Sequence, residues 1–587
     1  MFHVFALIMG STTRVEVSRW PEEAWAFTDS LEPCDLAVLT PPIPISHAYF
    51  IANQLRKSIF ERPARTELER RRLAVHGFRR ASRTMRALGS PGSGLLPTAL
   101  YLKSSQAAIS VAEPVVREIL EHCAASICGR VLLDEEALRA CAAAGMCSIL
   151  EAPKLISTAC ALGYAKMLPA VGIGEAGGFV CNRCGARTGI VQVPCSRCGR
   201  SECAMCVECR SMGAARECLA LFIGPEVACT PVAAEVHVQD PMYNYSLTEV
   251  QKQALEECVR WYREPGGSQE LLVWAVCGAG KSEVAFGTIA EALRQGRQAA
   301  FAVPRRDVAA EIQPRLASAF PALEPAAFYG GSSRRNHDSN VTVLTCHQAM
   351  RFSGRFHLIV LDEADAFPYF GSESLASSLR RALAPGGRIL VMTATPSAGH
   401  LARVRSGTMP VVRISARHHG RALPVPEVVC CSDIREAAVS EVRSSVDSGW
   451  PVFVFAPGRK SCEQLAALLK SRLSSCTVDW IHSHRADRDA VRERFARRAI
   501  DVLVATSVME RGITVEGADV VIAGADCVRI FDHRALVQMA GRAGRWTGRP
   551  EGRVSYVCTR RTPAMTMAVS MIKEMNADAR VRGFISD

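Results

Sequence analysis

The segment Ala275–Ser282 reads AVCGAGKS and decides the fold of the second half of the chain. It follows the apolar run 271–276 and precedes a segment, 282–293, whose apolar residues have helical spacing. A strand, a glycine-rich loop and a helix in this order are the context in which a P-loop holds phosphate groups at a helix N-terminus. Glycines let backbone N–H groups approach the phosphates closely. We therefore predict a nucleotide site that contains Gly278, Ala279, Gly280, Lys281 and Ser282, with the Ser282 hydroxyl binding Mg²⁺.

Short apolar runs alternate with helical segments from about residue 245 onward. The first series comprises 271–276, 299–303, 341–345, 356–362 and 388–395, and the second comprises 452–457, 501–506 and 519–524. Such alternation is typical of parallel α/β sheets. We predict an α/β fold with two tandem RecA-like parallel-sheet lobes, which follow a cysteine-rich zinc-ribbon module and a mixed, mainly helical N-terminal region. The predicted domains are 1–170 (the N-terminal region, of unknown role), 171–235 (the module), 240–415 (the first lobe) and 416–587 (the second lobe).

Two carboxylates, Asp362 and Glu363, follow the apolar run of the predicted strand 356–362. Adjacent carboxylates at a buried strand end are costly without a cation, so we predict that Asp362 binds Mg²⁺ and Glu363 polarises the attacking water. In the second series, QMAGRAGR at 538–545 places Arg542 and Arg545 three residues apart. On a helix this spacing puts both guanidinium groups on one face, from which they would reach the γ-phosphate. The predicted catalytic residues are Lys281, Asp362, Glu363, Gln538, Arg542 and Arg545.

Seven cysteines lie close together ahead of the P-loop. Cys181 pairs with Cys184, and Cys195 pairs with Cys198, each as C-x-x-C. Cys203, Cys206 and Cys209 follow, with Cys206 and Cys209 again as C-x-x-C. Two such pairs supply the four thiolates of a structural zinc site. Spacing alone favours the first two pairs, but seven cysteines exceed one site, so one zinc using four of them and two metals sharing thiolates both stay open. The alternative is a redox C-x-x-C, which normally stands alone beside a βαβ unit.

The composition is that of a globular protein, because 48% of the 587 residues are apolar and 22% are charged. The sequence contains no charge-free apolar run of the ~18 residues that a membrane-spanning helix needs. The apolar stretch 1–9 lacks the basic start and the cleavage site of a signal peptide. The 24 cysteines are therefore expected to be reduced or metal-bound in a cytoplasmic protein. The net charge of +12 suits a polyanionic partner such as nucleic acid.

This ordered set of motifs resembles the superfamily-two helicases and, within them, the ComFA family of late-competence ATPases. The resemblance rests on CVECRSMG at 206–213, TCHQAMRF at 345–352, DEADAFPYF at 362–370, ALPVP at 422–426, MERGIT at 509–514 and MIKEMNADARVRGF at 571–584. The motor is also similar to that of the replication-restart helicase PriA. The resemblance implies that Gln251 reads adenine, that Gly512 belongs to the nucleotide site, and that Arg305, Arg306 and His347 lie on DNA-facing loops. It also implies that the most regular zinc ligands are Cys181, Cys184, Cys206 and Cys209, which conflicts with the choice from spacing and keeps all six paired cysteines as candidates.

The resemblance implies a function in DNA uptake. Such a protein is an ATPase that is stimulated by single-stranded DNA, uses ATP, Mg²⁺ and Zn²⁺, and draws transforming DNA into the cytoplasm. Its implied partners are the membrane DNA channel, at the inner face of the cytoplasmic membrane, and a phosphoribosyltransferase-like competence protein (ComFC), and a homo-oligomer is left open. The alternatives are a DNA repair or replication-restart helicase and an ATP-gated DNA-binding scaffold. The presence of Glu363 and of both arginines argues against the scaffold.

Overall fold

The computed structural model describes residues 3–8, 13–18, 35–39, 45–59, 67–87, 100–102, 121–143, 152–161, 163–174, 177–227, 240–243, 246–332, 339–506, 517–545, 548–549 and 551–585. These residues form two compact units. Unit 1 comprises Met1–Cys229, Cys346–His357 and Gly371–Gly387, and unit 2 comprises Thr230–Thr345, Leu358–Phe370 and Arg388–Asp587. Two stretches of the predicted first lobe, 346–357 and 371–387, therefore pack with the N-terminal part of the chain.

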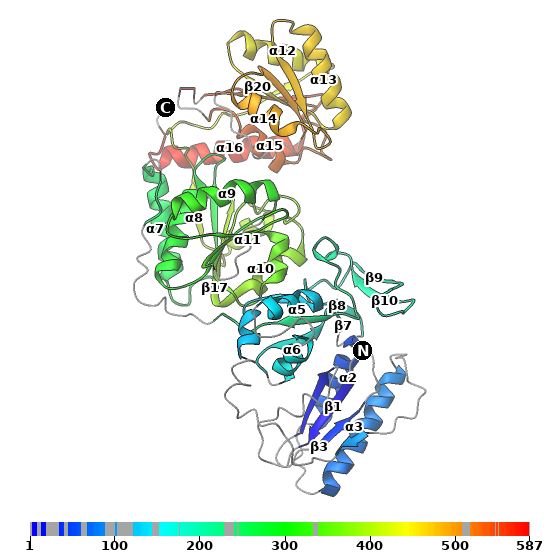
Figure 1. Ribbon diagram of the computed structural model, residues 1–587. Coiled ribbons are helices and arrows are strands. Elements are labelled where there is room, and N and C mark those ends of the chain that lie inside the picture. Colours follow the sequence, from blue (N-terminus) through cyan, green and yellow to red (C-terminus); the bar gives the residue numbers. More distant parts are fainter. Residues whose placement is uncertain are drawn as a thin grey trace. The chain divides into compact units, whose positions relative to one another are not determined.

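Unit 1 begins with an antiparallel sheet of strand order β2-β1-β3-β4 (Figure 1). Its strands are β1 (His3–Ile8), β2 (Thr13–Ser18), β3 (Asp35–Val38) and β4 (Leu100–Leu102). The alternate residues Val4 and Ala6 of β1 are buried, as expected for strands with one face on a core. That core includes apolar residues of α2 (Ile45–Ile59), which is followed by α3 (Glu67–Ala87).

The rest of unit 1 contains short strands and the cysteine-rich module. A three-stranded sheet has the order β5-β11-β6, and two hairpins pair β7 with β8 and β9 with β10. The strands are β5 (Val131–Leu133), β6 (Lys166–Pro169), β7 (Val171–Ile173), β8 (Phe179–Cys181), β9 (Ile190–Val193), β10 (Cys203–Cys206) and β11 (Ala220–Ile223). The helices are α5 (Asp134–Ala143), α6 (Ala152–Ala161), α10 (Glu373–Ala382), and the 3-10 turns η1 (Arg210–Met212) and η2 (Cys346–Arg351).

The first sheet of unit 2 has seven strands in the order β14-β15-β13-β16-β17-β12-β18. They are β12 (Glu270–Ala275), β13 (Ala299–Val303), β14 (Ala326–Phe328), β15 (Val341–Thr345), β16 (Phe356–Leu361), β17 (Leu383–Thr393) and β18 (Val411–Ile414). The helices that alternate with these strands are α7 (Glu249–Arg263), α8 (Lys281–Arg294), α9 (Arg306–Ala319) and α11 (Ala398–Arg405). All residues of β13 are buried, which explains why its sequence is a continuous apolar run.

The second sheet of unit 2 has the order β19-β24-β23-β20-β22-β21, and the pairings recorded for it are parallel. Its strands are β19 (Glu427–Cys430), β20 (Val452–Phe455), β21 (Val478–Ile481), β22 (Val502–Ala505), β23 (Asp519–Ala523) and β24 (Val554–Cys558). Its helices are α12 (Ile434–Asp447), α13 (Arg459–Arg472), α14 (Arg488–Ala496), α15 (His533–Ala540) and α16 (Pro563–Val581). The predicted α/β fold with two parallel-sheet lobes is thus confirmed. Functional groups of such sheets gather in loops at the carboxyl ends of the strands.

Among the described helices, none combines the length with the apolar character that is needed to cross a membrane.

Candidate functional site

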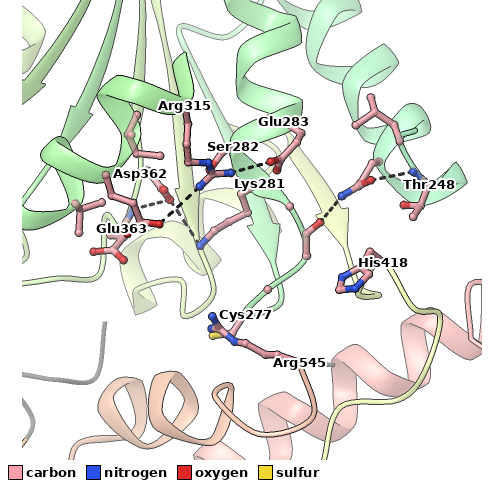
Figure 2. A pocket seen from close by; sticks show the side chains of 18 of the residues that line it. Thr248, Cys277, Lys281, Ser282, Glu283, Arg315, Asp362, Glu363, His418 and Arg545 are labelled. Carbon is pink, nitrogen blue, oxygen red and sulfur yellow. Dashed lines mark hydrogen bonds and ion pairs between the residues drawn. The ribbon is translucent and has the colours of Figure 1, made fainter. Parts of the chain in front are cut away.

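A cleft of about 1010 Å³ lies at the P-loop of unit 2 (Figure 2). Parts of both lobes line it. The predicted site residues along its wall are Gln251, Gly278, Ala279, Gly280, Lys281, Ser282, Asp362, Glu363, Gln538, Arg542 and Arg545. Gly512, in the MERGIT motif, lies outside the described residues. The structure therefore brings together residues that the sequence spreads over four separate motifs.

The P-loop connects β12 to α8. Gly278 and Gly280 have φ angles of 80° and 74°, a region that glycine enters without a steric cost. Helix α8 begins at Lys281, directly after the loop. The first N–H groups of a helix have no partner within it, and the helix dipole makes this end positive. An anionic phosphate is thus stabilised at this position.

Lys281 faces an acidic residue across the cleft. Its Nζ atom lies 3.6 Å from Oδ1 of Asp362, as the dashed line in Figure 2 shows. Burial by itself would lower the pKa of Lys281, but the Asp362 carboxylate and further negative groups raise it above its usual value. Lys281 is therefore a cation that can neutralise phosphate charge.

The acidic pair has the character of a site for a divalent cation. Asp362 is only 6% exposed, and its Oδ1 accepts a hydrogen bond of 2.8 Å from the backbone N–H of Glu363. Glu363 has a φ angle of 55°, which is uncommon for a residue with a side chain and occurs often at functional sites. Asp362 and the Ser282 hydroxyl both line the cleft. A carboxylate and a hydroxyl are ligands that Mg²⁺ accepts, so the donors fit the predicted ion.

Gln251 ties the start of α7 to the P-loop. Its Oε1 accepts a hydrogen bond of 2.9 Å from the backbone N–H of Thr248, and its Nε2 donates to the carbonyl oxygen of Ala279 at 2.9 Å. A Cβ atom at Gly280 would lie 2.1 Å from this Nε2 atom. Glycine is therefore favoured here both by its φ angle of 74° and by the close approach of Gln251. The role of Gln251 in reading adenine stays a prediction.

Asp365 is a functional candidate that the sequence analysis did not single out. The hydroxyl groups of Thr393 and Thr395 donate to its two carboxylate oxygens at 2.7 and 2.8 Å, and Gln538 Nε2 donates to Oδ2 at 3.2 Å. The carboxylate thus joins the end of β17 in the first lobe to α15 in the second. Its position as the last residue of the DEAD sequence is a signal that could have identified it.

The two arginines of QMAGRAGR do not lie on a helix, which corrects the sequence prediction. Helix α15 ends at Ala540, and Arg542 and Arg545 follow in the turn after it. The turn contains Gly544, with a φ angle of 64°, and Arg545 Nε donates to the carbonyl oxygen of Gly541 at 2.9 Å. Both arginines still line the cleft. Burial lowers the pKa of Arg545 below its ordinary value, but a guanidinium stays charged.

The cysteines of the module form two groups of four in unit 1. Within each group the sulfur atoms all lie within 4.8 Å of one another: Cys181, Cys184, Cys206 and Cys209 in the first group, and Cys195, Cys198, Cys203 and Cys218 in the second. The grouping from spacing, which joined the first two C-x-x-C pairs, differs from this arrangement. The physical reason is that the second pair lies in the loop between β9 and β10, and the antiparallel pairing of these strands brings Cys206 back towards the first pair. Cys218 was not among the predicted ligands, because it is a single residue nine positions after the last pair.

The first cysteine group is fixed by two arginines, one of which is fully buried. Arg183, between Cys181 and Cys184, is fully buried and donates to the carbonyl oxygens of Met212 and Gly213 at 2.9 and 2.8 Å. Arg381 of α10 donates to the carbonyl oxygens of Asn182 at 3.2 Å and of Met350 at 3.0 Å. Burial lowers the pKa of Arg381 to about 10. The first C-x-x-C turn thus packs against α10 and η2.

Comparisons with known proteins agree with this geometry. A DEAD/DEAH box helicase domain matches residues 248–404, and a helicase conserved C-terminal domain matches residues 434–547. The chain is 36% identical over 317 residues to the competence protein ComFA of Bacillus subtilis (strain 168), and the alignment covers 52% of this chain and 68% of that protein. The chain belongs to the ComFA family. The predicted family is thus confirmed.

Further relatives of the ComFA-family chain extend the comparison. Competence protein ComFA of Streptococcus pneumoniae (strain ATCC BAA-255 / R6) is 29% identical over 317 residues, with 52% of this chain and 73% of that protein covered. The ATP-dependent DNA helicase RecG of Synechocystis sp. (strain ATCC 27184 / PCC 6803 / Kazusa) is 26% identical over 327 residues, with 51% and 38% covered. The chain is therefore an ATPase of the superfamily-two helicase type, and its DEAD/DEAH box domain implies the use of ATP and Mg²⁺.

Proposed function

We propose that the chain is an ATP-driven motor that moves along single-stranded DNA and draws transforming DNA into the cytoplasm. The observation that carries this proposal is one cleft lined by groups of both lobes, with Lys281, Asp362 and Glu363 on one side and Gln538, Arg542 and Arg545 on the other. A triphosphate held between two bodies keeps them closed, and its hydrolysis releases them. Such a cycle moves any strand that both bodies grip.

The proposed roles of the site residues follow from their positions. Lys281 and the N–H groups of the P-loop bind the β- and γ-phosphates, and Gln251 contacts adenine. Ser282 and Asp362 hold Mg²⁺, which neutralises charge on the phosphate oxygens when it is bound. Glu363 orients and polarises the attacking water. Arg542 and Arg545 stabilise the negative charge that develops on the γ-phosphate, with Gln538 beside them.

A single strand is favoured by the loop that follows the acidic pair. Phe367 is 77% exposed and Phe370 is 41% exposed, which is unusual for large apolar side chains. Exposed aromatic rings stack on the faces of unpaired bases, and a duplex hides these faces. Arg306, exposed at the start of α9, is a candidate for contacts with the phosphate backbone.

The competence role is taken from the relatives, which are named competence proteins. We place the motor in the cytoplasm, at the inner face of the membrane beside the DNA channel, with the phosphoribosyltransferase-like competence protein as a partner.

We also propose that Cys181, Cys184, Cys206 and Cys209 bind a structural zinc ion. Sulfur atoms of Cys181 and Cys209 lie 3.6 Å apart, and those of Cys184 and Cys206 lie 3.7 Å apart. In a tetrahedral site with zinc–sulfur bonds of about 2.3 Å, neighbouring sulfur atoms are about 3.8 Å apart, and the two observed distances match this value.

The test is the ATPase rate of the purified chain with single-stranded DNA, duplex DNA and RNA at fixed salt. We expect single-stranded DNA to raise kcat at least ten-fold more than the other two polymers. Lys281→Ala, which removes the phosphate-binding cation, should abolish the activity, and Glu363→Gln should bind ATP but turn over very slowly. Equal rates with all three polymers would exclude the proposed motor.

A repair or restart helicase is the second candidate, and the similarity to RecG favours it. The two functions differ in what the motor does to a duplex. A forked DNA substrate with a fluorophore and a quencher on its two strands distinguishes them. Strand separation driven by ATP supports the helicase, and displacement of a protein block from a single strand without strand separation supports the import motor.

A further inference from the structure

We infer that the module holds a second, independent zinc ion, bound by Cys195, Cys198, Cys203 and Cys218. The four sulfur atoms lie within 4.8 Å of one another, and the sulfur atoms of Cys195 and Cys218 are 3.8 Å apart. A disulfide would need about 2.05 Å, whereas a tetrahedral zinc–thiolate site needs about 3.8 Å. Four sulfur ligands suit Zn²⁺, which prefers tetrahedral thiolate sites, over harder cations.

The second group repeats the backbone turn of the first. In the first turn, the N–H of Gly185 donates to the carbonyl oxygen of Cys181 at 2.8 Å. In the second, the N–H of Gly199 donates to the carbonyl oxygen of Cys195 at 2.9 Å. The two glycines have φ angles of 80° and 70°.

Cys203 and Cys218 are positioned by the buried carboxylate of Glu217. The fully buried Glu217 accepts a hydrogen bond from the backbone N–H of Ala204 at 3.2 Å, and its own N–H donates to the Ala204 carbonyl oxygen at 2.8 Å. Ser46 Oγ and Arg200 Nη1 lie 2.8 and 3.0 Å from its carboxylate oxygens. These contacts hold Cys203, at the start of β10, beside Cys218. The ligand set is therefore assembled by the fold and not by a C-x-x-C pair alone.

Metal analysis of the full-length chain, purified without chelator, tests this proposal. We expect two equivalents of zinc in the unchanged chain and one in Cys203→Ser, in Cys218→Ser and in Cys206→Ser, the last of which belongs to the first site. The control Cys128→Ser, outside both groups, should keep two. Titration of the metal-free chain with Co²⁺ should give the charge-transfer absorption of four-thiolate sites, with about half the amplitude in Cys218→Ser.

Three results would overturn the proposal. The first is one equivalent of zinc in the unchanged chain, and the second is two equivalents of zinc in both Cys203→Ser and Cys218→Ser. The third is the detection of disulfide bonds among the four cysteines by mass spectrometry. Loss of both metals from Cys218→Ser would overturn the independence of the two sites. None of these readouts depends on ATP hydrolysis, so they do not test the motor function.

A separate observation concerns Arg417, in the segment between the two sheets. We propose that Arg417 is a positioning residue that couples the P-loop to the arginine turn of the second lobe. Its Nε donates to the carbonyl oxygen of Cys277 in the P-loop at 2.9 Å. Its Nη1 donates to the carbonyl oxygens of Ala543 and Gly544 at 2.6 and 2.7 Å, and its Nη2 donates to that of Gly541 at 3.0 Å.

The surroundings of Arg417 explain why this link is specific. The residue is 2% exposed, and among the described residues no carboxylate forms an ion pair with it. A buried guanidinium without a counter-ion is costly, so its five N–H donors depend on carbonyl oxygens. The carbonyl oxygens come from both lobes and flank Arg542 and Arg545. Arg417 therefore sets the distance between the P-loop and the two arginines when the lobes are closed.

This proposal rests on the proposed ATPase, and its test separates binding from turnover. In Arg417→Met we expect kcat to fall at least ten-fold while the Kd of a fluorescent ATP analogue changes less than three-fold, because Arg417 is not among the cleft-lining residues. Arg417→Lys keeps the charge and part of the hydrogen bonding, and should recover part of kcat. The matched control Arg421→Met changes an exposed arginine of the same segment and should leave both constants unchanged.

The outcomes distinguish this proposal from the motor itself. An inactive unchanged chain would remove the proposed function. An active unchanged chain with an equally active Arg417→Met variant would overturn only the positioning role. A higher Kd for the ATP analogue with an unchanged kcat in Arg417→Met would also overturn the positioning role, because Arg417 would then act in binding. If Arg417→Met does not fold, the same result in Arg417→Lys would overturn it.

Discussion

At the scale of single residues, Gly541 of the second lobe lies directly against the P-loop. A Cβ atom at this position would lie 2.4 Å from Cβ and 2.7 Å from Sγ of Cys277. Overpacking of this kind costs about 1–3 kcal/mol, which corresponds to a change of roughly five- to 150-fold in an equilibrium constant. We predict that Gly541→Ala lowers the kcat for ATP at least ten-fold, measured with saturating single-stranded DNA.

Two variants control this prediction. Gly399→Ala adds the same methyl group where the nearest atom outside the local backbone is 3.7 Å away, and should have no effect. Cys277→Gly removes both clashing atoms, so it should restore part of the activity of Gly541→Ala. Full activity of the single Gly541→Ala variant would show that the lobes do not approach each other here during turnover.

His419 gives unit 2 a dependence on pH. Burial, together with the charges of Arg417 and its neighbours, lowers the pKa of His419 to about 4, and its Nε2 lies 3.0 Å from the carbonyl oxygen of Gly544. The ordinary pKa is about 6.5, so the unfolded chain binds a proton more readily than the folded chain between these values. The neutral His419 side chain therefore makes its full contribution to the stability of the folded chain above pH 6.5. This contribution is lost as the pH falls towards 4.

We predict that the melting temperature of the chain falls less between pH 7.5 and pH 5 in His419→Gln than in the unchanged chain. The expected difference is roughly 2 °C, as for about 1 kcal/mol in a large domain. Scanning fluorimetry in buffers of equal ionic strength measures it, with the exposed His76→Gln as the control. Parallel slopes in the His419→Gln variant and the unchanged chain would contradict the assignment.

Residues with a chemical signature could be predicted from the sequence, and residues that act through geometry could not. Lys281, Asp362 and the glycines of the P-loop stand in a motif whose spacing reflects their chemistry. Arg417 belongs to no motif, because its partners are backbone carbonyl oxygens that any sequence offers. Cys218 has no paired cysteine in its own segment, and only the fold brings it to Cys203.

At the scale of elements, the loop after the acidic pair allows a test of the DNA contact. Phe367 lies in this loop, largely exposed, and stacking on a base contributes about 1–3 kcal/mol. We predict that Phe367→Ala raises the concentration of single-stranded DNA needed for half-maximal ATPase stimulation at least five-fold, while the rate without DNA stays unchanged. The control Met567→Ala removes another exposed apolar side chain, on α16. An unchanged DNA requirement in Phe367→Ala would exclude base stacking at this loop.

The strands of unit 2 were more predictable than the turns between them. Central parallel strands are buried on both faces, so β13 is an uninterrupted apolar run and His357 is the single polar residue of β16. The prediction that Arg542 and Arg545 lie on a helix was wrong, because the spacing of two arginines contains no information about where a helix ends. The helix ends before Gly541, where a side chain would collide with Cys277.

At the scale of the whole molecule, the two units should respond to different ligands. A ligand that binds only the native state stabilises it by about 2.7 kcal/mol at a concentration of 100 times its Kd. We predict two transitions in calorimetry of the full chain. A non-hydrolysable ATP analogue with Mg²⁺ should raise the temperature of one transition, and removal of zinc with a chelator should lower that of the other. A single transition that both treatments shift together would contradict this separation.

The N-terminal unit was the least predictable part of the molecule from sequence. Its first sheet is built from short strands, such as β1, that carry no chemical motif. The predicted domain boundaries stay predictions. They treated the chain as consecutive blocks, whereas 346–357 and 371–387 pack with residues that precede them by more than a hundred positions.

This interleaving means that no single cleavage of the peptide chain yields an intact motor. A chain that begins near residue 240 keeps both matched helicase domains but strips Arg381 of its carbonyl partners at 182 and 183, and leaves a charged group and the neighbouring apolar side chains exposed to water. Conversely, grafting the cysteine module onto a foreign ATPase would require η2 and α10 to travel with it. The matched helicase domain thus supplies two segments, η2 and α10, to the unit that contains the cysteine module, so neither part can be exchanged without redesigning the other.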